Sequence, residues 1–304
     1  MLELFFAAVL IDTVVAPPVE GYVEVHEWGA VTFTQENVIF GADPGTDPHA
    51  TAIPPDQWEE PLARAPVVYF HGEPFSGTFT VSVTAGSFIE LYPVPESLMD
   101  TSPMPEYPSG TARWNIAAAG PYSGEGGMPE RGMAFTSCVT PELLEIWREP
   151  PAMLLQFEDG SSEEFVYYEC RLNSPADSAY YPVLMSDDGP ALDTGWEGEI
   201  LRCVRTGESV ALELDSEGGT EAVEPADVHQ LLCDWSGGHM KSQELQAMWR
   251  TWEDWVLGGE WSGDTLEIFT LPGSTVEGIS SISLETDEYM LVEYRRFFLG
   301  MIGR

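Results

Sequence analysis

Short runs of β-branched and aromatic residues, separated by clusters of glycine, proline and aspartate, recur along most of this chain. Such runs predict β-strands, and the regular turn signals between them are typical of an antiparallel sandwich. Residues 78–83 (TFTVSV) alternate polar and apolar, as a half-buried strand does, and Ala85 with Gly86 is expected to form the next turn. The expected strands span residues 23–34, 66–70, 77–83, 87–92, 113–118, 153–157, 165–171 and 210–214.

The C-terminal part of the chain follows a different period. From residue 242 to residue 257 the apolar residues recur at helical spacing, and Gly258 with Gly259 is expected to end this helix. A strand is expected at 265–271. The apolar segment at 286–298 fits either a last helix, capped at its start, or a strand, and the pattern leaves both open.

These patterns predict a β-rich α+β fold. Residues 17–220 are expected to form an antiparallel β-sandwich-like body, and residues 221–304 a smaller α+β C-terminal portion packed on it. Two segments rich in proline and glycine, 41–61 and 92–132, lack periodicity and are expected to be long surface loops.

The chain is strongly acidic, with 51 acidic and 12 basic residues and a formal net charge of −39; Lys241 is its only lysine. This charge repels phosphate backbones, so we expect no nucleic-acid partner. It attracts divalent cations and basic proteins, and it suits a protein hydrated in a saline exterior. Disorder does not follow, because 43% of the residues are hydrophobic and 12% aromatic, enough for a large core.

Residues 1–16 predict a signal peptide. They form an apolar segment in which Val14 and Ala16 occupy the −3 and −1 positions of a cleavage site, although Asp12 interrupts the run and no Lys or Arg precedes it. No stretch reaches the roughly 18 apolar residues of a transmembrane helix. We therefore expect a protein that is secreted, or located in the periplasm or cell envelope, without a membrane span.

Four cysteines, Cys138, Cys170, Cys203 and Cys233, lie in the middle of the chain. In an exported protein an even set predicts two disulfides, for which three connectivities are open. Cys170 and Cys203 lie in strand-like segments and could face each other on neighbouring strands. The gaps of about thirty residues lack the close pairs of a thiolate zinc site.

Two of the five histidines stand near carboxylates, because His26 precedes Glu27 and His71 lies two residues before Glu73; His49 lies between the two pairs. Two His and one carboxylate can hold a catalytic zinc. His26 and His71 are therefore candidate ligands of a divalent cation, with Glu27 or Glu73 as the candidate general base of a hydrolase. The alternative is that both His are structural residues at strand ends. The chain has no phosphate-binding loop, dinucleotide-binding glycine motif or nucleophile elbow.

The tryptophans fall into two groups. Those of the C-terminal helix recur at the spacing of one buried face: Trp249, Trp252 and Trp255. The others lie near expected loops, where exposed indoles would bind a ligand by stacking: Trp28, Trp58, Trp114 and Trp261. His229 and His239, before the Trp-rich helix, are expected to lie in a solvated loop.

Several motifs resemble an uncharacterised family of secreted bacterial proteins. In order along the chain they are HEWG at 26–29, TFT at 32–34, PVVYF at 66–70, FVYY at 165–168, AMWRTW at 247–252 and TLEIFTLP at 265–272. The resemblance covers most of the chain after the leader and implies an exported protein. The family has no established activity, so the resemblance implies no reaction.

Two hypotheses from different classes follow. The favoured one is a non-catalytic binding or structural protein of the cell envelope or exterior, which binds an extracellular polymer, a basic protein or a divalent cation. The alternative is a metal-dependent hydrolase that uses His26 and His71. Geometry distinguishes them, because a metal site requires the two His side chains to lie within a few ångströms of each other.

Overall fold

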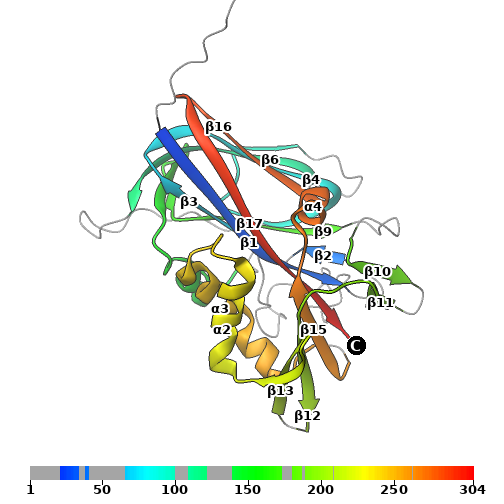
Figure 1. Cartoon of the computed structure of the whole chain (residues 1–304). Helices are drawn as coiled ribbons and strands as arrows, with labels where there is room; N and C mark the ends of the chain where they lie inside the picture. Colours follow the sequence, from blue (N-terminus) through cyan, green and yellow to red (C-terminus); the bar gives the residue numbers. More distant parts are fainter. Residues whose placement is uncertain are drawn as a thin grey trace, which may run out of the picture.

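Strands dominate the computed structural model of the chain (Figure 1), which describes residues 21–33, 38–40, 66–99, 109–121, 139–172, 180–186, 189–207, 209–261 and 263–304. Its first two thirds contain β1 (Gly21–Phe33), β2 (Val38–Phe40), β3 (Val67–Gly72), β4 (Phe75–Tyr92), β5 (Ser97–Met99), β6 (Ser109–Pro121), α1 (Pro141–Trp147), β7 (Met153–Phe157), β8 (Ser162–Glu163), β9 (Val166–Leu172), β10 (Val183–Ser186), β11 (Gly189–Leu192), β12 (Ile200–Thr206), β13 (Ser209–Ser216) and β14 (Gly219–Val223).

The last third is richer in helix. A 3-10 turn at Pro225–Asp227 leads into α2 (Val228–Ser236), α3 (Ser242–Gly258), β15 (Thr265–Thr270), α4 (Gly273–Ile279), β16 (Ser280–Thr286) and β17 (Met290–Gly303). The predicted fold class, a β-rich α+β fold with an antiparallel body and a smaller C-terminal portion that carries helices, is confirmed. Within the described part of the chain, no helix has the length and apolar character needed to cross a membrane.

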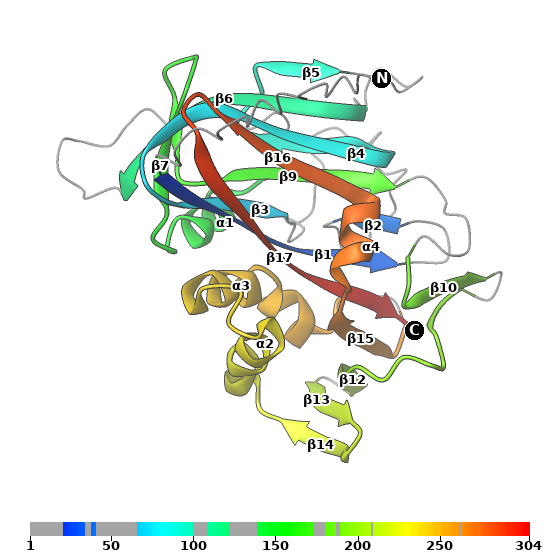
Figure 2. The ribbon, with the colours of Figure 1, turned by 45° about the horizontal axis from the view of Figure 1, so that its top comes forward.

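Strand β1 lies at the centre of the large sheet (Figure 2). On one side it pairs with β17 in parallel along its whole length, from Gly21 opposite Met290 to Phe33 opposite Ile302. On its other side it pairs antiparallel with β3 and β2, which both continue to β9. The C-terminal strand is therefore built into the same sheet as the N-terminal one.

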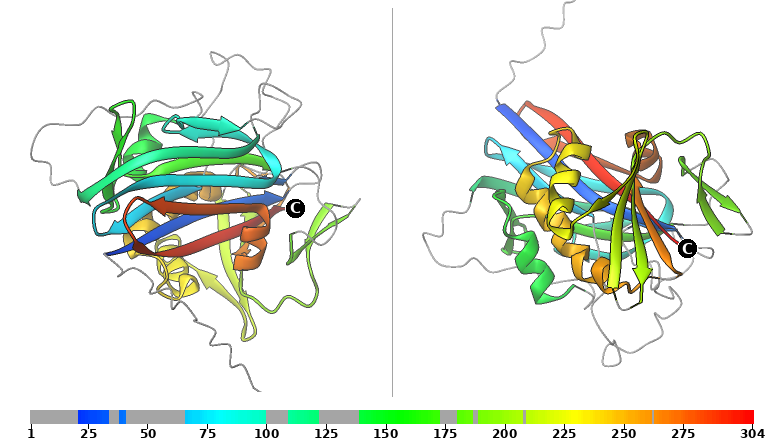
Figure 3. Two further views of the ribbon diagram at one scale, coloured as in Figure 1. Left: turned by 90° about the horizontal axis from the view of Figure 1, so that it is seen from above. Right: turned by 60° about the horizontal axis from the view of Figure 1, so that its bottom comes forward.

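Two hydrophobic cores lie on the two faces of β1. Successive strand residues point to opposite faces, so Val23 and Val25 pack into the core with β4, β6, β9 and β16, whereas Trp28 and Ala30 pack into the core under the helices. Figure 3 shows α2 and α3 on one side of the β1–β17 pair, with β4 and β16 on the other. Side chains on the helix-covered face of β1 can therefore meet residues of α3.

Helix α3 forms where the sequence predicts it. Lys241 at its N-cap has extended backbone angles, and Gly259 ends it in the left-handed conformation (φ 68°) that glycine adopts without strain. The predicted apolar face is also confirmed, since Trp249, Trp252 and Trp255 are all buried. Trp252 packs edge-on against Trp28 of β1, with ring centroids 6.0 Å apart, so the helix is docked directly on the sheet.

Two local predictions are wrong, and one choice that the sequence left open is resolved. The turn at Ala85 and Gly86 is absent, because β4 continues from Phe75 to Tyr92 and only its register changes between Ser82 and Ser87. Strands β5 and β6 interrupt the loop expected over 92–132, and the loop expected over 41–61 lies outside the described residues. The open choice at 286–298 resolves in favour of a strand, because β17 gains backbone partners in β1 along its whole length.

The disulfide prediction is also wrong. Cys170, Cys203 and Cys233 are free thiols, and Cys138 lies outside the described residues. Cys170 belongs to the core with β4 and Cys203 to the core under the helices, so the two thiols are on opposite sides of the sheet and cannot pair.

Candidate functional site

His26 of β1 and His71 of β3 lie side by side on the face of the sheet that α3 covers. In the β1–β3 ladder Glu24 lies opposite His71 and Tyr69 opposite His26, and paired residues share a face. The imidazole rings meet edge to face with centroids 4.6 Å apart. The geometric condition for a shared His site, which the sequence left open, is therefore met.

Glu244 of α3 completes the cluster. Its carboxylate lies 2.9 Å from His26 Nδ1 and 2.6 Å from His71 Nε2. One ligand atom from each of the three residues lies within 4.8 Å of the others. All three side chains are buried, with exposures of 2% for His26, 6% for His71 and 0% for Glu244. Three elements that are distant in the sequence thus meet in a buried His-His-Glu cluster.

The local charge distribution keeps Glu244 ionised. Burial by itself raises the pKa of this carboxyl, but the hydrogen bonds from His26 and His71 outweigh burial and lower the pKa to about 2. The Lys241 backbone N–H also donates to Glu244 Oε2 at 3.1 Å. A carboxylate in the first turn of a helix commonly accepts such a hydrogen bond from the N-cap residue. The carboxylate is thus the common acceptor of the cluster.

The outer nitrogens of the two histidines face different partners. His26 Nε2 is buried without a hydrogen-bond partner, and a carboxylate oxygen of Glu24 lies 3.5 Å away. His71 Nδ1 lies 2.8 Å from the Lys241 ammonium. Burial lowers the pKa of His71 and Lys241 lowers it further, while Glu244 acts in the opposite direction. We therefore treat His71 as neutral near pH 7.

The cluster has the donor set of a transition-metal site. Two imidazoles and one carboxylate suit zinc and other divalent first-row metals. The present N···O distances of 2.6 and 2.9 Å are shorter than the about 3.4 Å that separates two ligands of a tetrahedral zinc. A bound metal would therefore require the Glu244 carboxylate to separate from each imidazole nitrogen by less than about 1 Å.

Glu27 and Glu73, the predicted general bases, lie away from the cluster. Glu27 points to the opposite face of β1, where Tyr168 donates to Oε1 at 2.5 Å and Arg296 forms an ion pair with Oε2. The exposed carboxylate of Glu73 lies beside Gly21, five residues and about 16 Å along β1 from His26. Neither acid faces the space between the two His rings.

The remaining predicted residues lie elsewhere. His49 and Trp58 lie outside the described residues, and His229 lies on α2 rather than in a loop, while His239 is exposed in the turn after that helix. The exposure predicted for three tryptophans is wrong, because Trp28, Trp114 and Trp261 are at most 2% exposed. Their rings fill the cores, so they present no stacking face to a ligand.

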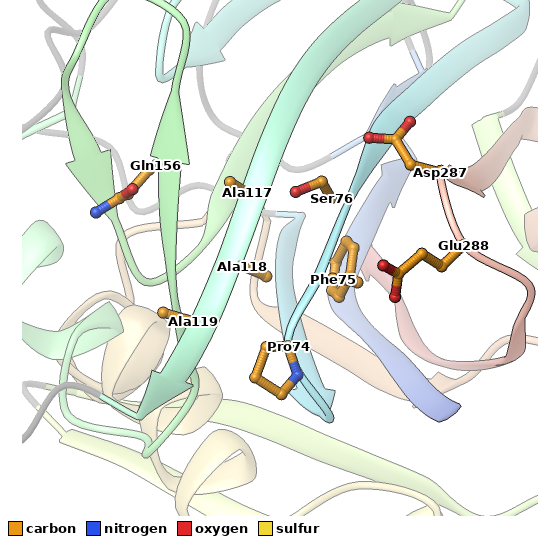
Figure 4. Close-up of a pocket in the computed structure, with 9 residues that line it drawn as sticks. All are labelled: Pro74, Phe75, Ser76, Ala117, Ala118, Ala119, Gln156, Asp287 and Glu288. Atoms are coloured by element: carbon orange, nitrogen blue, oxygen red, sulfur yellow. The ribbon is translucent and has the colours of Figure 1, made fainter. Parts of the chain in front are cut away.

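A surface groove of about 370 Å³ lies at the β4–β6 edge of the molecule (Figure 4). It is lined by alanines of β6, by residues 74–76 at the start of β4, by Gln156 of β7 and by the acids Asp287 and Glu288 (Figure 4). None of the cluster residues lines it. The groove is therefore separate from the His-His-Glu cluster.

Sequence reasoning missed Glu244 as a member of the site, although it recognised the helix start nearby. The residue is 218 positions from His26, and its only local signal is an acid in the first turn of a helix, which usually serves as a cap. No protein-family model, curated protein or solved structure matches this chain. The interpretation of the cluster therefore depends on its own chemistry.

Proposed function

We propose that this chain is an exported, acidic metal-binding protein that holds one divalent transition-metal ion, with zinc as the first candidate. The observation that carries the proposal is the convergence of His26, His71 and Glu244 on one buried point. Two neutral imidazoles and a carboxylate are the donors that such a metal prefers. Hard cations such as calcium require more oxygen ligands than this cluster offers.

The outer nitrogen of His26 supports this assignment. A His that binds metal through one nitrogen commonly donates its other N–H to a carboxylate, which fixes the ring. His26 offers Nδ1 to the cluster, while Nε2 is buried, lacks a hydrogen bond and lies 3.5 Å from Glu24. The tautomer that frees Nδ1 for a metal would place a proton on Nε2, where Glu24 could accept it.

The burial of the cluster favours a binding or structural role over catalysis. Each ligand residue is at least nine-tenths buried under α3, and closed sites are typical of structural metals. The leader-like residues 1–16 and the acidic composition favour a location in the cell envelope or outside the cell, where an extracellular polymer or a basic protein would meet the surface.

The test is the metal content and metal affinity of the purified chain. Wild type should bind one equivalent of zinc, measured by mass spectrometry after gel filtration and by competition with a chromophoric chelator. His26→Ala and His71→Ala should each weaken zinc binding by at least about tenfold, as the loss of one ligand would. Glu73→Ala is the matched control, because it removes an exposed carboxylate outside the cluster. Equal zinc binding by all four proteins would refute the proposal.

A second candidate function is a metal-dependent hydrolase. The observation in its favour is the ligand count, because three protein ligands leave a fourth position open, as in catalytic zinc sites. This candidate requires solvent to reach the cluster and a base other than Glu27 or Glu73. Zinc-dependent turnover of ester or peptide substrates that His71→Ala abolishes would support it, and turnover that zinc removal leaves unchanged would exclude it.

A further inference from the structure

The outer nitrogens of the two cluster histidines face opposite charges. His26 Nε2 faces the Glu24 carboxylate at 3.5 Å, the arrangement that a metal-binding His requires. His71 Nδ1 instead faces the ammonium group of Lys241 at 2.8 Å. An ammonium group beside a metal-binding nitrogen is unexpected. Lys241, which supplies this ammonium group, is the only lysine of the chain.

The hydrogen-bond partners of His71 determine which of its two ring nitrogens carries the proton. A lysine ammonium has three donors and no acceptor, so it requires a lone pair on His71 Nδ1. The Nε2 atom must then carry the ring proton, and it donates this proton to Glu244 Oε1 at 2.6 Å. His71 thus forms a bridge between the ammonium and the carboxylate of two residues in the first turn of α3.

This bridge is incompatible with a metal at the same nitrogen. A metal requires the lone pair of His71 Nε2, so the ring proton must move from Nε2 to Nδ1 by way of solvent, or leave the ring. In the first case the Nδ1–H group would point at the ammonium of Lys241, donor against donor, at 2.8 Å. In both cases a second cation would stand within a few ångströms of the metal, which is unfavourable in a buried place.

We propose that Lys241 is an internal competitor of the metal, an inference that rests on the proposed function: the Lys241 ammonium docks on His71 in the metal-free protein and must leave before a metal binds. Only the side chain has to move. Lys241 is half-buried at the start of α3, its backbone N–H remains bonded to Glu244, and its flexible stem can carry the ammonium into solvent.

The competition has a consequence for occupancy. A chain with a net charge of −39 attracts divalent cations of every kind. Displacing Lys241 costs each ion the same free energy, so it lowers every affinity by the same factor and leaves the ratio of affinities unchanged. An ion that binds imidazole weakly then needs a still higher concentration to occupy the site, whereas one that binds imidazole tightly occupies it at a low concentration.

The first test compares zinc affinities of the full chain by chelator competition. Lys241→Met keeps the aliphatic stem and removes the competing charge, so it should bind zinc about tenfold more tightly than wild type, the equivalent of one hydrogen bond to a charged group. Lys241→Arg keeps a charged donor and should remain near wild type. Arg250→Met removes a positive charge from the exposed side of the same helix, where Arg250 pairs with Glu149, and controls for net charge.

The second test uses the single lysine as a reporter. A short pulse of an acetylating reagent, followed by mass spectrometry of the peptide that contains Lys241, should show faster modification when the protein is saturated with zinc. Far-UV circular dichroism establishes that each variant is folded.

The outcomes separate the two proposals. Equal zinc affinities of wild type and Lys241→Met, or Lys241 acetylation that zinc leaves unchanged, would overturn the inference and leave the metal site in place. Failure of wild type and Lys241→Met alike to bind zinc would overturn the proposed function, and the inference with it.

Discussion

Replacing Glu244 by glutamine in the metal-free protein should destabilise the fold by about 3 kcal/mol at pH 7. The magnitude follows from the pKa of this carboxyl, which folding lowers from 4.5 to about 2. At about 1.4 kcal/mol for each pH unit, the difference corresponds to about 3 kcal/mol of stability. The side chain is fully buried, so solvent screening does not reduce it. Two hydrogen bonds to a charged group, at roughly 1.5–3 kcal/mol each, give a similar figure.

The sign of the pH dependence follows from the same shift. Because folding lowers the pKa of Glu244, the unfolded chain binds more protons between about pH 2 and 4.5. The stabilisation is therefore fully present above pH 4.5 and is lost as the pH falls to about 2. Self-repulsion of the acidic surface also changes over this range, but it acts equally on wild type and variant and cancels in their difference.

The assay is urea unfolding followed by tryptophan fluorescence in the presence of a chelator, at pH 7 and at pH 3. Asp254→Asn, an exposed acid on the same helix, is the matched control and should change stability by less than about 0.5 kcal/mol. A destabilisation by Glu244→Gln below about 1 kcal/mol at pH 7, or one of equal size at both pH values, would refute the reasoning.

Three further outcomes are expected. Gly72→Ala should lower the free energy of unfolding by about 2–4 kcal/mol in thermal or urea unfolding. Gly72 has φ 115°, and an added Cβ would lie 2.3 Å from the Tyr22 carbonyl oxygen. A neutral effect would show that the β1–β3 register is wrong. A thiol reagent should modify Cys233 within the native state but Cys170 only on unfolding, since burial raises the Cys170 pKa well above its ordinary value; equal rates would contradict the assigned burial. Trp28→Ala should cost about 3–5 kcal/mol, whereas a truly loop-exposed indole would cost almost nothing in the same measurement.

The strands and the Trp-rich helix were predictable because their signals are local. Each signal is the spacing of apolar residues over fewer than about twenty positions. Tertiary packing of the same apolar residues then stabilises the element that the spacing predicts. The turn at Ala85 was mispredicted for the complementary reason. Small residues permit a turn but do not require one, and the pairing of Val83 with Ser280 and of Gly86 with Leu172 on either side of Ala85 favours continued strand there.

The site was predictable only in part. Adjacent carboxylates made His26 and His71 candidates, but their meeting depends on the register that places Glu24 opposite His71, and no pattern in the sequence fixes that register. The same alternation that joins the two histidines sends Glu27 to the other face. Glu244 joins the cluster only because α3 packs on the sheet. Its contact with His26 spans 218 residues, and no local sequence pattern predicts such a contact.

The parallel pairing of β1 with β17 has a consequence for how the protein reaches its folded state. The central strand lacks one of its two neighbours until the last fifteen or so residues of the chain are present. Pairing over such a sequence separation carries a high loop-closure cost and makes folding slow. The large sheet should therefore remain incomplete during folding until β17 pairs with β1. Truncation before β17 should yield a protease-sensitive product, because the central strand would then lack its parallel partner.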